Sequence, residues 1–252
     1  MLRRLGGLAQ DLGWGMLHLL YPGICHACGR SLSRDEQHFC QACRQALVLD
    51  PHPTCPRCAG TVGPFANVEE GCPSCRASSF HFEKAFRLGP YEGLLRELIL
   101  RLKHPPGEEL AEVLGALWAE QTGPRLRGWG AEMVIPVPLH WRRRWQRGYN
   151  QSEVLARCLA CSLGLPCRPR WLSRIRNTPK QTEQTAEGRR ANVRGAFQVR
   201  PGAGLRGKTI LLVDDVLTTG ATCSEAAHAL RQGGAAGVVV AVLAAAGQSA
   251  RK

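Results

Sequence analysis

The chain has 252 residues, of which 44% are hydrophobic, so it has room for one α/β domain and one small domain. No apolar run approaches the ~18 residues that a membrane helix needs, which argues against membrane insertion. Arg3 and Arg4 precede an apolar pattern, but Asp11 interrupts it and no small-residue cleavage site follows before Cys25. We therefore expect a short amphipathic helix at the N-terminus, no export signal and a cytoplasmic protein.

The net charge of +13 is confined to one part of the chain. Residues 139–208 contain 16 Lys or Arg against three Glu, whereas the remaining residues carry 17 basic and 17 acidic side chains. Such a basic segment suits a polyanion such as pyrophosphate, a nucleotide or nucleic acid. The alternative is a basic surface that contacts only solvent.

Cysteine spacing decides the interpretation of residues 1–81, which we expect to form a zinc-binding domain. Eight of the twelve cysteines lie in this part of the chain, where they form four C-x-x-C pairs, and in a reducing cytosol such pairs bind metal more often than they form disulfides. They suffice for one or two structural zinc ions with tetrahedral Cys₄ ligands. Sequential and interleaved pairing both stay open, as do disulfides and substitution by His26, His38, His52 or His81. The expected ligands are Cys25, Cys28, Cys40, Cys43, Cys55, Cys58, Cys72 and Cys75.

Residues 82–252 alternate strand and helix patterns, which predicts an α/β domain with a mainly parallel sheet flanked by helices. Gly123-Pro124 is expected to break a helix, and residues 173–195, which lack periodicity, are expected to form a mobile polar loop. The expected strands are 84–91, 133–137, 170–172, 210–213 and 235–246, and the expected helices are 94–102, 108–121, 151–163 and one that begins near residue 222.

The stretch 208–224 carries the clearest chemical signal. A buried apolar strand, Ile210–Val213, is followed by Asp214 and Asp215 and then by small or hydroxylic residues that open a helix. Ligands of open parallel sheets bind at the carboxyl ends of the strands, and the free N–H groups of a helix N-terminus suit a phosphate. Adjacent carboxylates accept hydrogen bonds from vicinal hydroxyls, so the stretch predicts a sugar-phosphate site.

Residues 202–209 also fit the G-x-x-x-x-G-K-[ST] pattern of a P-loop. A P-loop requires a helix that begins at its Lys-Thr, whereas Thr209 opens a strand here. We therefore reject a P-loop NTPase and expect a turn at residues 200–208.

The stretch 208–224 closely resembles the phosphoribosyl pyrophosphate (PRPP) signature of type I phosphoribosyltransferases. The resemblance implies a fold of that type, with Asp214 and Asp215 as catalytic residues that hold the ribose hydroxyls. It implies that Mg²⁺ accompanies PRPP, that the loop after an early strand binds the pyrophosphate, and that residues 173–195 close over the site. The implied PRPP ligands are Val216, Leu217, Thr218, Thr219, Gly220, Ala221 and Thr222, together with Pro138, Leu139, His140 and Lys180.

Three further stretches narrow the family: Val134–Gln151, Arg174–Thr182 and Arg189–Phe197. With the cysteine pairs before them and the PRPP-type motif after them, their order resembles the ComF family of competence-associated, phosphoribosyltransferase-like proteins, over roughly residues 20–245. The chain departs from the family at Pro105-Pro106, so Lys103 receives no role from the resemblance. A role in uptake of single-stranded DNA is implied, with a competence helicase as a partner.

Two classes of function stay open. The protein is either a binding and scaffold factor for single-stranded DNA or an active transferase that transfers phosphoribose from PRPP to an unidentified base or other nucleophile. A PRPP-sensing regulator would need a DNA-reading helix module, which the sequence does not indicate. The expected nucleic-acid contacts are Arg142, Arg143, Arg144 and Arg147, with Trp141, Trp145 and Tyr149 among them as candidates for stacking on bases.

Overall fold

The computed structural model describes residues 23–76, 78–177 and 186–247. Its contacts divide the chain into two compact units, Met1–Leu47 and Val48–Lys252. The helix expected at the N-terminus lies outside the described residues. The domain boundary that we expect between residues 81 and 82 stays a prediction. Within the described residues, no helix is both long and apolar enough to cross a bilayer.

The described part of the first unit is built around the first two C-x-x-C pairs. An isolated antiparallel bridge joins Ile24 to Ser31 and closes the first turn. Helix α2 (Gln41–Val48) begins directly after Cys40, contains Cys43 of the second pair and buries Leu47. Besides its cysteines, the larger buried apolar side chains of this part are Leu32, Phe39 and Leu47. So few apolar groups form a small core, which explains why the fold here depends on its cysteines.

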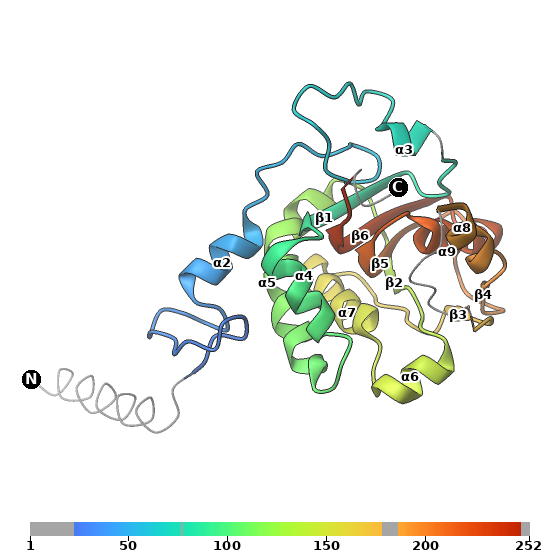
Figure 1. The fold of residues 1–252 in the computed structure, drawn as a ribbon. Helices are drawn as coiled ribbons and strands as arrows, with labels where there is room; N and C mark the ends of the chain where they lie inside the picture. Colours follow the sequence, from blue (N-terminus) through green and yellow to red (C-terminus); the bar gives the residue numbers. More distant parts are fainter. Residues whose placement is uncertain (1–22, 77, 178–185, 248–252) are drawn as a thin grey trace, which may run out of the picture. The chain divides into compact units, whose positions relative to one another are not determined.

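The second unit is organised around a four-stranded parallel sheet in the order β1-β6-β5-β2 (Figure 1). All nine residues of β6 are buried, as expected of an apolar strand that is covered on both faces. The prediction of a mainly parallel sheet is therefore confirmed. The strands are β1 (Lys84–Pro90), β2 (Met133–Pro136), β5 (Thr209–Leu217) and β6 (Gly237–Ala245).

Helices cover both faces of this sheet (Figure 1). Helices α5 and α7 pack on each other and on one face, and α9 packs on β5 and β6 from the other. Helix α7 begins where the Asn150 side chain accepts a hydrogen bond from Ser152 N and ends at Gly164 in the left-handed conformation, so the predicted range 151–163 is confirmed. The helices are α4 (Gly93–Arg101), α5 (Gly107–Arg127), α7 (Gln151–Leu163) and α9 (Ala221–Gln232).

Helix α5 corrects one prediction, because it runs through Gly123-Pro124 to Arg127 instead of ending near Gln121. Thr122, Gly123 and Leu126 are buried in this last part. A Cβ built on Gly123 would lie 3.3 Å from Ser162 Oγ of α7, so the glycine permits close approach of the two helices. Packing against α7 thus outweighs the local preference for a break.

Strand β5 corrects a second prediction, because it does not end at Val213. It continues to Leu217, and Val216 and Leu217 pair with Ala244 and Ala245 of β6. The acids Asp214 and Asp215 therefore lie within the strand, near its carboxyl end. The turn expected at residues 200–208 is confirmed, and β5 begins at Thr209, which excludes a P-loop helix there.

Part of the expected mobile loop 173–195, residues 178–185, lies outside the described residues, and the described parts on either side contain regular structure. Strand β3 pairs antiparallel with β4 in a separate two-stranded sheet, so the strand expected near residues 170–172 does not join the main sheet. Two helices were also not predicted, α8 within this segment and α6 directly after the 138–140 loop. The bounds are β3 (Leu172–Arg174), β4 (Phe197–Val199), α6 (Trp141–Arg147) and α8 (Ala186–Val193).

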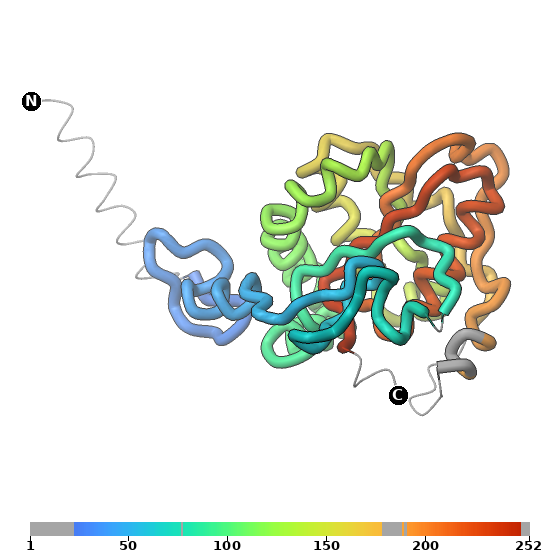
Figure 2. Tube along the Cα trace, turned by 90° about the horizontal axis from the view of Figure 1, so that it is seen from above, coloured from blue at the N-terminus to red at the C-terminus, as the bar shows by residue number. Residues whose placement is uncertain are grey.

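The second pair of C-x-x-C motifs belongs to the same compact unit as the sheet. Its chain, drawn in cyan, runs alongside β1 (Figure 2), where Ala85 N donates to Arg57 O at 2.8 Å. Arg87 of β1 reaches from the sheet to this segment and pairs with Asp50 at 2.8 Å. Backbone and side-chain bonds therefore fasten this cysteine segment to the edge of the sheet.

Candidate functional site

The acid pair of β5 is buried and held by three side chains from two other parts of the chain. Ser152 Oγ donates to Asp214 Oδ1 at 2.8 Å, and Gln151 Nε2 donates to Asp215 Oδ2 at 3.1 Å, both from the first turn of α7. Lys103 Nζ, just after α4, lies 3.2 Å from Asp215 Oδ2. The two carboxylates are thus oriented by contacts across the sheet's carboxyl edge, which is the edge where α/β folds bind ligands.

Burial is the main electrostatic influence on this pair. Burial, together with the neighbouring charge of Asp215, raises the pKa of Asp214 to about 7, although the Ser152 hydroxyl, the Asp215 N–H and Lys103 act in the opposite direction. Two adjacent carboxylates in a desolvated place share negative charge poorly. Hydroxyl groups that donate hydrogen bonds to the pair, or a cation bound beside it, would therefore stabilise the charged carboxylates.

The loop 216–222 links β5 to α9 at the same edge. Gly220 is the N-cap of α9, with φ 78°, and as a glycine it has no side chain to cap the helix. Ala221 N donates to Thr219 Oγ1 at 3.4 Å, and Ser224 N donates to Gly220 O at 2.8 Å. A helix N-terminus without a side-chain cap offers its N–H groups and the positive end of the helix dipole to an anion.

The loop 138–140 follows β2, the neighbour of β5 in the sheet. It is anchored where Val137 N donates to Val213 O at 2.8 Å and Asn150 Nδ2 donates to Val137 O at 3.2 Å. His140 is buried and caps α6, since its Nδ1 accepts from Arg142 N at 3.4 Å. Burial, with Arg142, Arg174 and Arg143 nearby, lowers the pKa of His140 and favours the neutral ring.

Arg143 and Arg174 form a cationic group beside this loop. Burial lowers the pKa of both guanidinium groups, and each is lowered further by a neighbouring arginine, Arg147 for Arg143 and Arg143 for Arg174. Asp214 acts on Arg174 in the opposite direction. Half-buried cations that repel each other next to an acid pair suit a multiply charged anion.

The four arginines expected to contact nucleic acid have different surroundings. Arg143 is half-buried near Arg174, Arg144 pairs with Glu153 at 3.2 Å, and Arg147 donates to Gln151. Arg142 is exposed, with its guanidinium 5.2 Å from the centre of the Trp141 ring. These four arginines do not present one uniform basic face. Each would therefore contribute differently to any contact with nucleic acid.

The structure assembles several site residues that the sequence reasoning missed. Lys103 was given no role because of the neighbouring prolines, yet it contacts Asp215. Ser152 and Gln151 follow the Arg147–Asn150 stretch without a recognisable spacing to the acids. Only the packing of α7 against β5 brings them together. Lys180 lies outside the described residues, and so do the side chains of Arg189 and Arg190.

The cysteines gather into two groups, each with four sulfurs within 4.8 Å of one another. A Zn–S bond of about 2.3 Å implies sulfurs roughly 3.8 Å apart at the corners of a tetrahedron. Cys28 and Cys40 lie 3.8 Å apart, and the pairs Cys55–Cys75 and Cys58–Cys72 each lie 3.7 Å apart. None of the twelve cysteines is joined in a disulfide.

This geometry resolves the pairing of the motifs. The first group is Cys25, Cys28, Cys40 and Cys43, and the second is Cys55, Cys58, Cys72 and Cys75. Pairing is therefore sequential, and neither group of the described residues includes a histidine. The donor sets fit two structural Cys₄ zinc ions, since thiolates without an open position leave no place for a substrate.

Comparisons with known proteins agree with this geometry. Models of a phosphoribosyl transferase domain and of a double zinc ribbon domain match residues 150–252 and 16–79. DNA utilization protein YhgH of Salmonella typhimurium is 31% identical over 225 residues, covering 88% of this chain and 96% of that protein. Competence protein F of Haemophilus influenzae is 28% identical, covering 82% and 90%. Competence protein ComFC of Bacillus subtilis is 26% identical, covering 92% and 88%.

Fold, cysteine groups and matched domains together define a phosphoribosyltransferase-like protein with an N-terminal double zinc ribbon. The similarity extends through both parts, from the cysteine motifs to the last strand. The chain belongs to the ComF family of competence and DNA-utilization proteins.

Proposed function

We propose that this protein binds PRPP or a related ribose phosphate together with Mg²⁺ and uses that site in the handling of single-stranded DNA. The observation that carries the proposal is the buried acid pair, held by Ser152, Gln151 and Lys103 beside an uncapped helix N-terminus. Carboxylates for hydroxyls and N–H groups for a phosphate, on one edge of a sheet, are what a ribose 5-phosphate requires.

Each part of the ligand has a matching group in this arrangement. The N–H groups at the start of α9 suit the 5-phosphate, and Asp214 and Asp215 suit the ribose hydroxyls. Arg143 and Arg174, next to the 138–140 loop, suit the pyrophosphate. Mg²⁺ prefers carboxylate and phosphate oxygens, and the raised pKa of Asp214 supports a cation at this place. When bound, the ion would neutralise charge on the pyrophosphate.

An active transferase is the alternative within the same pocket. Transfer would break the bond between C1 of the ribose and the pyrophosphate oxygen, so that negative charge collects on the leaving group. Arg143 and Arg174 would stabilise that charge, and the acid pair would hold the ribose that becomes cationic. The fold alone does not identify an acceptor. We therefore give binding precedence over transfer.

Calorimetry with PRPP or ribose 5-phosphate, with and without Mg²⁺, tests the binding proposal. Asp214→Asn and Asp215→Asn should each weaken binding by about 1.5–3 kcal/mol, because a charged acceptor for a hydroxyl is lost. The exposed Asp35→Asn is the matched control and should bind normally. If wild-type protein binds neither ligand at millimolar concentration, the proposal is wrong. Pyrophosphate release with candidate bases would favour the transferase alternative.

The outer face of α6 supports the DNA part of the proposal. Trp141 is 65% exposed and Trp145 is 85% exposed, and their spacing places them one turn apart on the same side of the helix. Tyr149, in contrast, is buried and donates to Leu102 O. Exposed tryptophans beside arginines suit stacking with unpaired bases. The relatives' names refer to DNA utilization and competence, which agrees with this assignment.

The proposal has two biological corollaries. A competence helicase would be the protein partner that shares the DNA strand. None of the twelve cysteines is joined in a disulfide, which suits a reducing cytoplasm. Co-purification with such a helicase and fractionation of cells test these two points.

A further inference from the structure

The second cysteine group is continuous with the hydrophobic core that supports the pocket. All four of its cysteines are buried, and they belong to the same cluster of buried side chains as Leu212 of β5 and Ala226 of α9. Phe80 and Phe82, which follow this group, belong to that cluster as well. Phe80, five residues after the last cysteine of this group, is thus part of the same core as α9, the helix whose N-terminus faces the proposed phosphate site.

Phe80 makes the decisive contact. Its ring is 9% exposed, stacks on Phe82 with centroids 4.8 Å apart and lies 5.9 Å from the guanidinium of Arg57, a residue between two of the cysteines. A Cβ built on Gly220 would lie only 2.6 Å from Phe80 Cε1. The ring therefore packs against the backbone of the α9 N-cap, where the left-handed conformation and the lack of a Cβ are both required.

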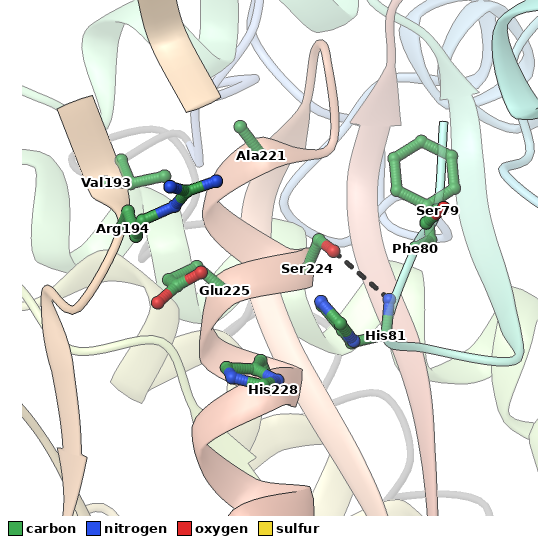
Figure 3. Close-up of a pocket in the computed structure, with 9 residues that line it drawn as sticks. All are labelled: Ser79, Phe80, His81, Val193, Arg194, Ala221, Ser224, Glu225 and His228. Atoms are coloured by element: carbon green, nitrogen blue, oxygen red, sulfur yellow. Dashed lines mark hydrogen bonds between the residues drawn. The ribbon is translucent and has the colours of Figure 1, made fainter. Parts of the chain in front are cut away.

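A hydrogen bond reinforces this contact. His81 N donates to Ser224 Oγ at 3.1 Å (Figure 3). Ser224 N in turn donates to Gly220 O at 2.8 Å. The two segments line a cavity of about 510 Å³, to which His228 and Glu225 of α9 also contribute (Figure 3). With open space on this side of α9, the contacts of Phe80 and His81 restrain the first turn of the helix.

We propose that the second cysteine group is a positioning element of the sugar-phosphate pocket. Metal bound there would hold Phe80 and His81 in place, and these residues would hold Gly220 and the first turn of α9 in the conformation that accepts a phosphate. The inference rests on the proposed function for its ligand. The cysteine sulfurs, spaced as zinc requires, show that the group fits its metal.

The expected effect follows from the fraction of molecules that are competent to bind. If loss of the Phe80 ring leaves only ~10% of molecules with the loop correctly placed, apparent affinity falls about tenfold. Phe80→Ala is the main variant, and Phe80→Leu should lose less because it still fills part of the space. The matched control is Phe65→Ala, since Phe65 lies in the same cysteine ribbon but is 98% exposed.

Two readouts on the full-length protein test the proposal. Amide hydrogen exchange should be faster in residues 218–224 of Phe80→Ala and unchanged in Phe65→Ala, with zinc content equal to wild type in both. Calorimetry with ribose 5-phosphate and Mg²⁺ should show the tenfold loss in Phe80→Ala alone. Wild-type exchange rates throughout residues 218–224 of a folded Phe80→Ala protein would overturn the proposal.

Further variants test the same proposal independently of Phe80→Ala. Should Phe80→Ala not fold, Ser224→Ala removes the acceptor for His81 N and should also accelerate exchange in residues 220–222; unchanged exchange would count against the proposal. Replacing Cys58 by Ser should accelerate exchange in the loop, whereas Cys28→Ser, in the first group, should not; equal effects would contradict it. If wild-type protein does not bind ribose 5-phosphate, the proposed function fails, and the exchange data still decide the coupling.

Discussion

The two cysteine groups each consist of four cysteines with C-x-x-C spacing, but they differ in their surroundings. In the first group Cys28 is exposed and Cys43 is half-buried, whereas all four cysteines of the second group are buried. The first group belongs to the unit Met1–Leu47. The second shares its core with the parallel sheet. The same motif thus organises a small unit in the first group, whereas in the second group it forms part of the hydrophobic core of a larger unit.

The difference teaches what metal contributes in each place. With few buried apolar side chains around it, the first group must derive most of its stability from metal, which in zinc-binding peptides supplies an apparent ~10–16 kcal/mol. The second group also depends on metal, but its loss would expose core that belongs to the sheet as well. Loss of a cysteine ligand in the second group should therefore destabilise the whole sheet-containing unit, whereas loss of one in the first group should destabilise only the first unit.

The largest expected effect is the contrast between Cys58→Ser and Cys28→Ser. Cys58→Ser should lower the free energy of unfolding of the sheet-containing unit by about 4 kcal/mol or more, because both a metal ligand and a buried core contact are lost. Cys28→Ser should change this unit by less than about 0.5 kcal/mol. Denaturant unfolding followed by emission of the buried Trp118 measures the difference, with zinc content as a check. Equal losses would contradict the comparison.

A buried ion pair sharpens the comparison by testing how firmly the second group is attached. The Arg87 side chain is 2% exposed and donates to Asp50 at 2.9 and 3.1 Å. Asp50→Asn should cost about 3–5 kcal/mol, because a buried guanidinium loses its counter-charge. Glu132→Gln is the control, since its pair with Lys208 is exposed and contributes little to stability. Similar small losses in thermal unfolding would mean that the second group is loosely attached.

The raised pKa of Asp214 predicts a pH effect within the second unit. The folded protein binds this proton more tightly than the unfolded chain, so the contribution of Asp214 to stability is most favourable at low pH and is lost as pH rises from about 4 to about 7. Asp214→Asn should therefore be more stable than wild type at pH 8, by on the order of 3 kcal/mol, and nearly equal at pH 4. Denaturant unfolding at the two values measures this, with Asp35→Asn as control. A constant difference at both pH values would refute the assignment.

The smallest expected effect concerns single-stranded DNA. Replacing Trp141 or Trp145 by Ala should weaken binding by about 1–3 kcal/mol, the value of one stacked base. Arg142→Ala should flatten the log–log salt dependence by ~0.7, the contribution of one phosphate contact on a single strand. Fluorescence anisotropy at several salt concentrations provides both numbers. Cys28→Ser should bind DNA normally; if it alone abolishes binding, the DNA surface lies in the first unit and the comparison must be redrawn.

The sequence by itself determined the local features. Apolar runs and helical spacing predicted the parallel strands and the range of α7, because strand burial and helix capping depend on residues that are neighbours in the sequence. The four C-x-x-C pairs predicted metal, and the order of strand, acids and small-residue loop predicted the phosphate site, since each motif lies within a few residues. Even the rejected P-loop could be decided locally, from the strand that begins at Thr209.

The tertiary structure decided which distant residues meet. It paired the cysteine motifs sequentially, brought Lys103 and Ser152 to the acid pair and placed Arg143 near Arg174 while Trp145 stayed exposed. It also carried α5 through Pro124, where packing on α7 outweighs the local break. The contact of Phe80 with Gly220 joins residues that are 140 positions apart. No local pattern encodes such a contact, because it depends on how the cysteine segment and α9 pack on a common sheet.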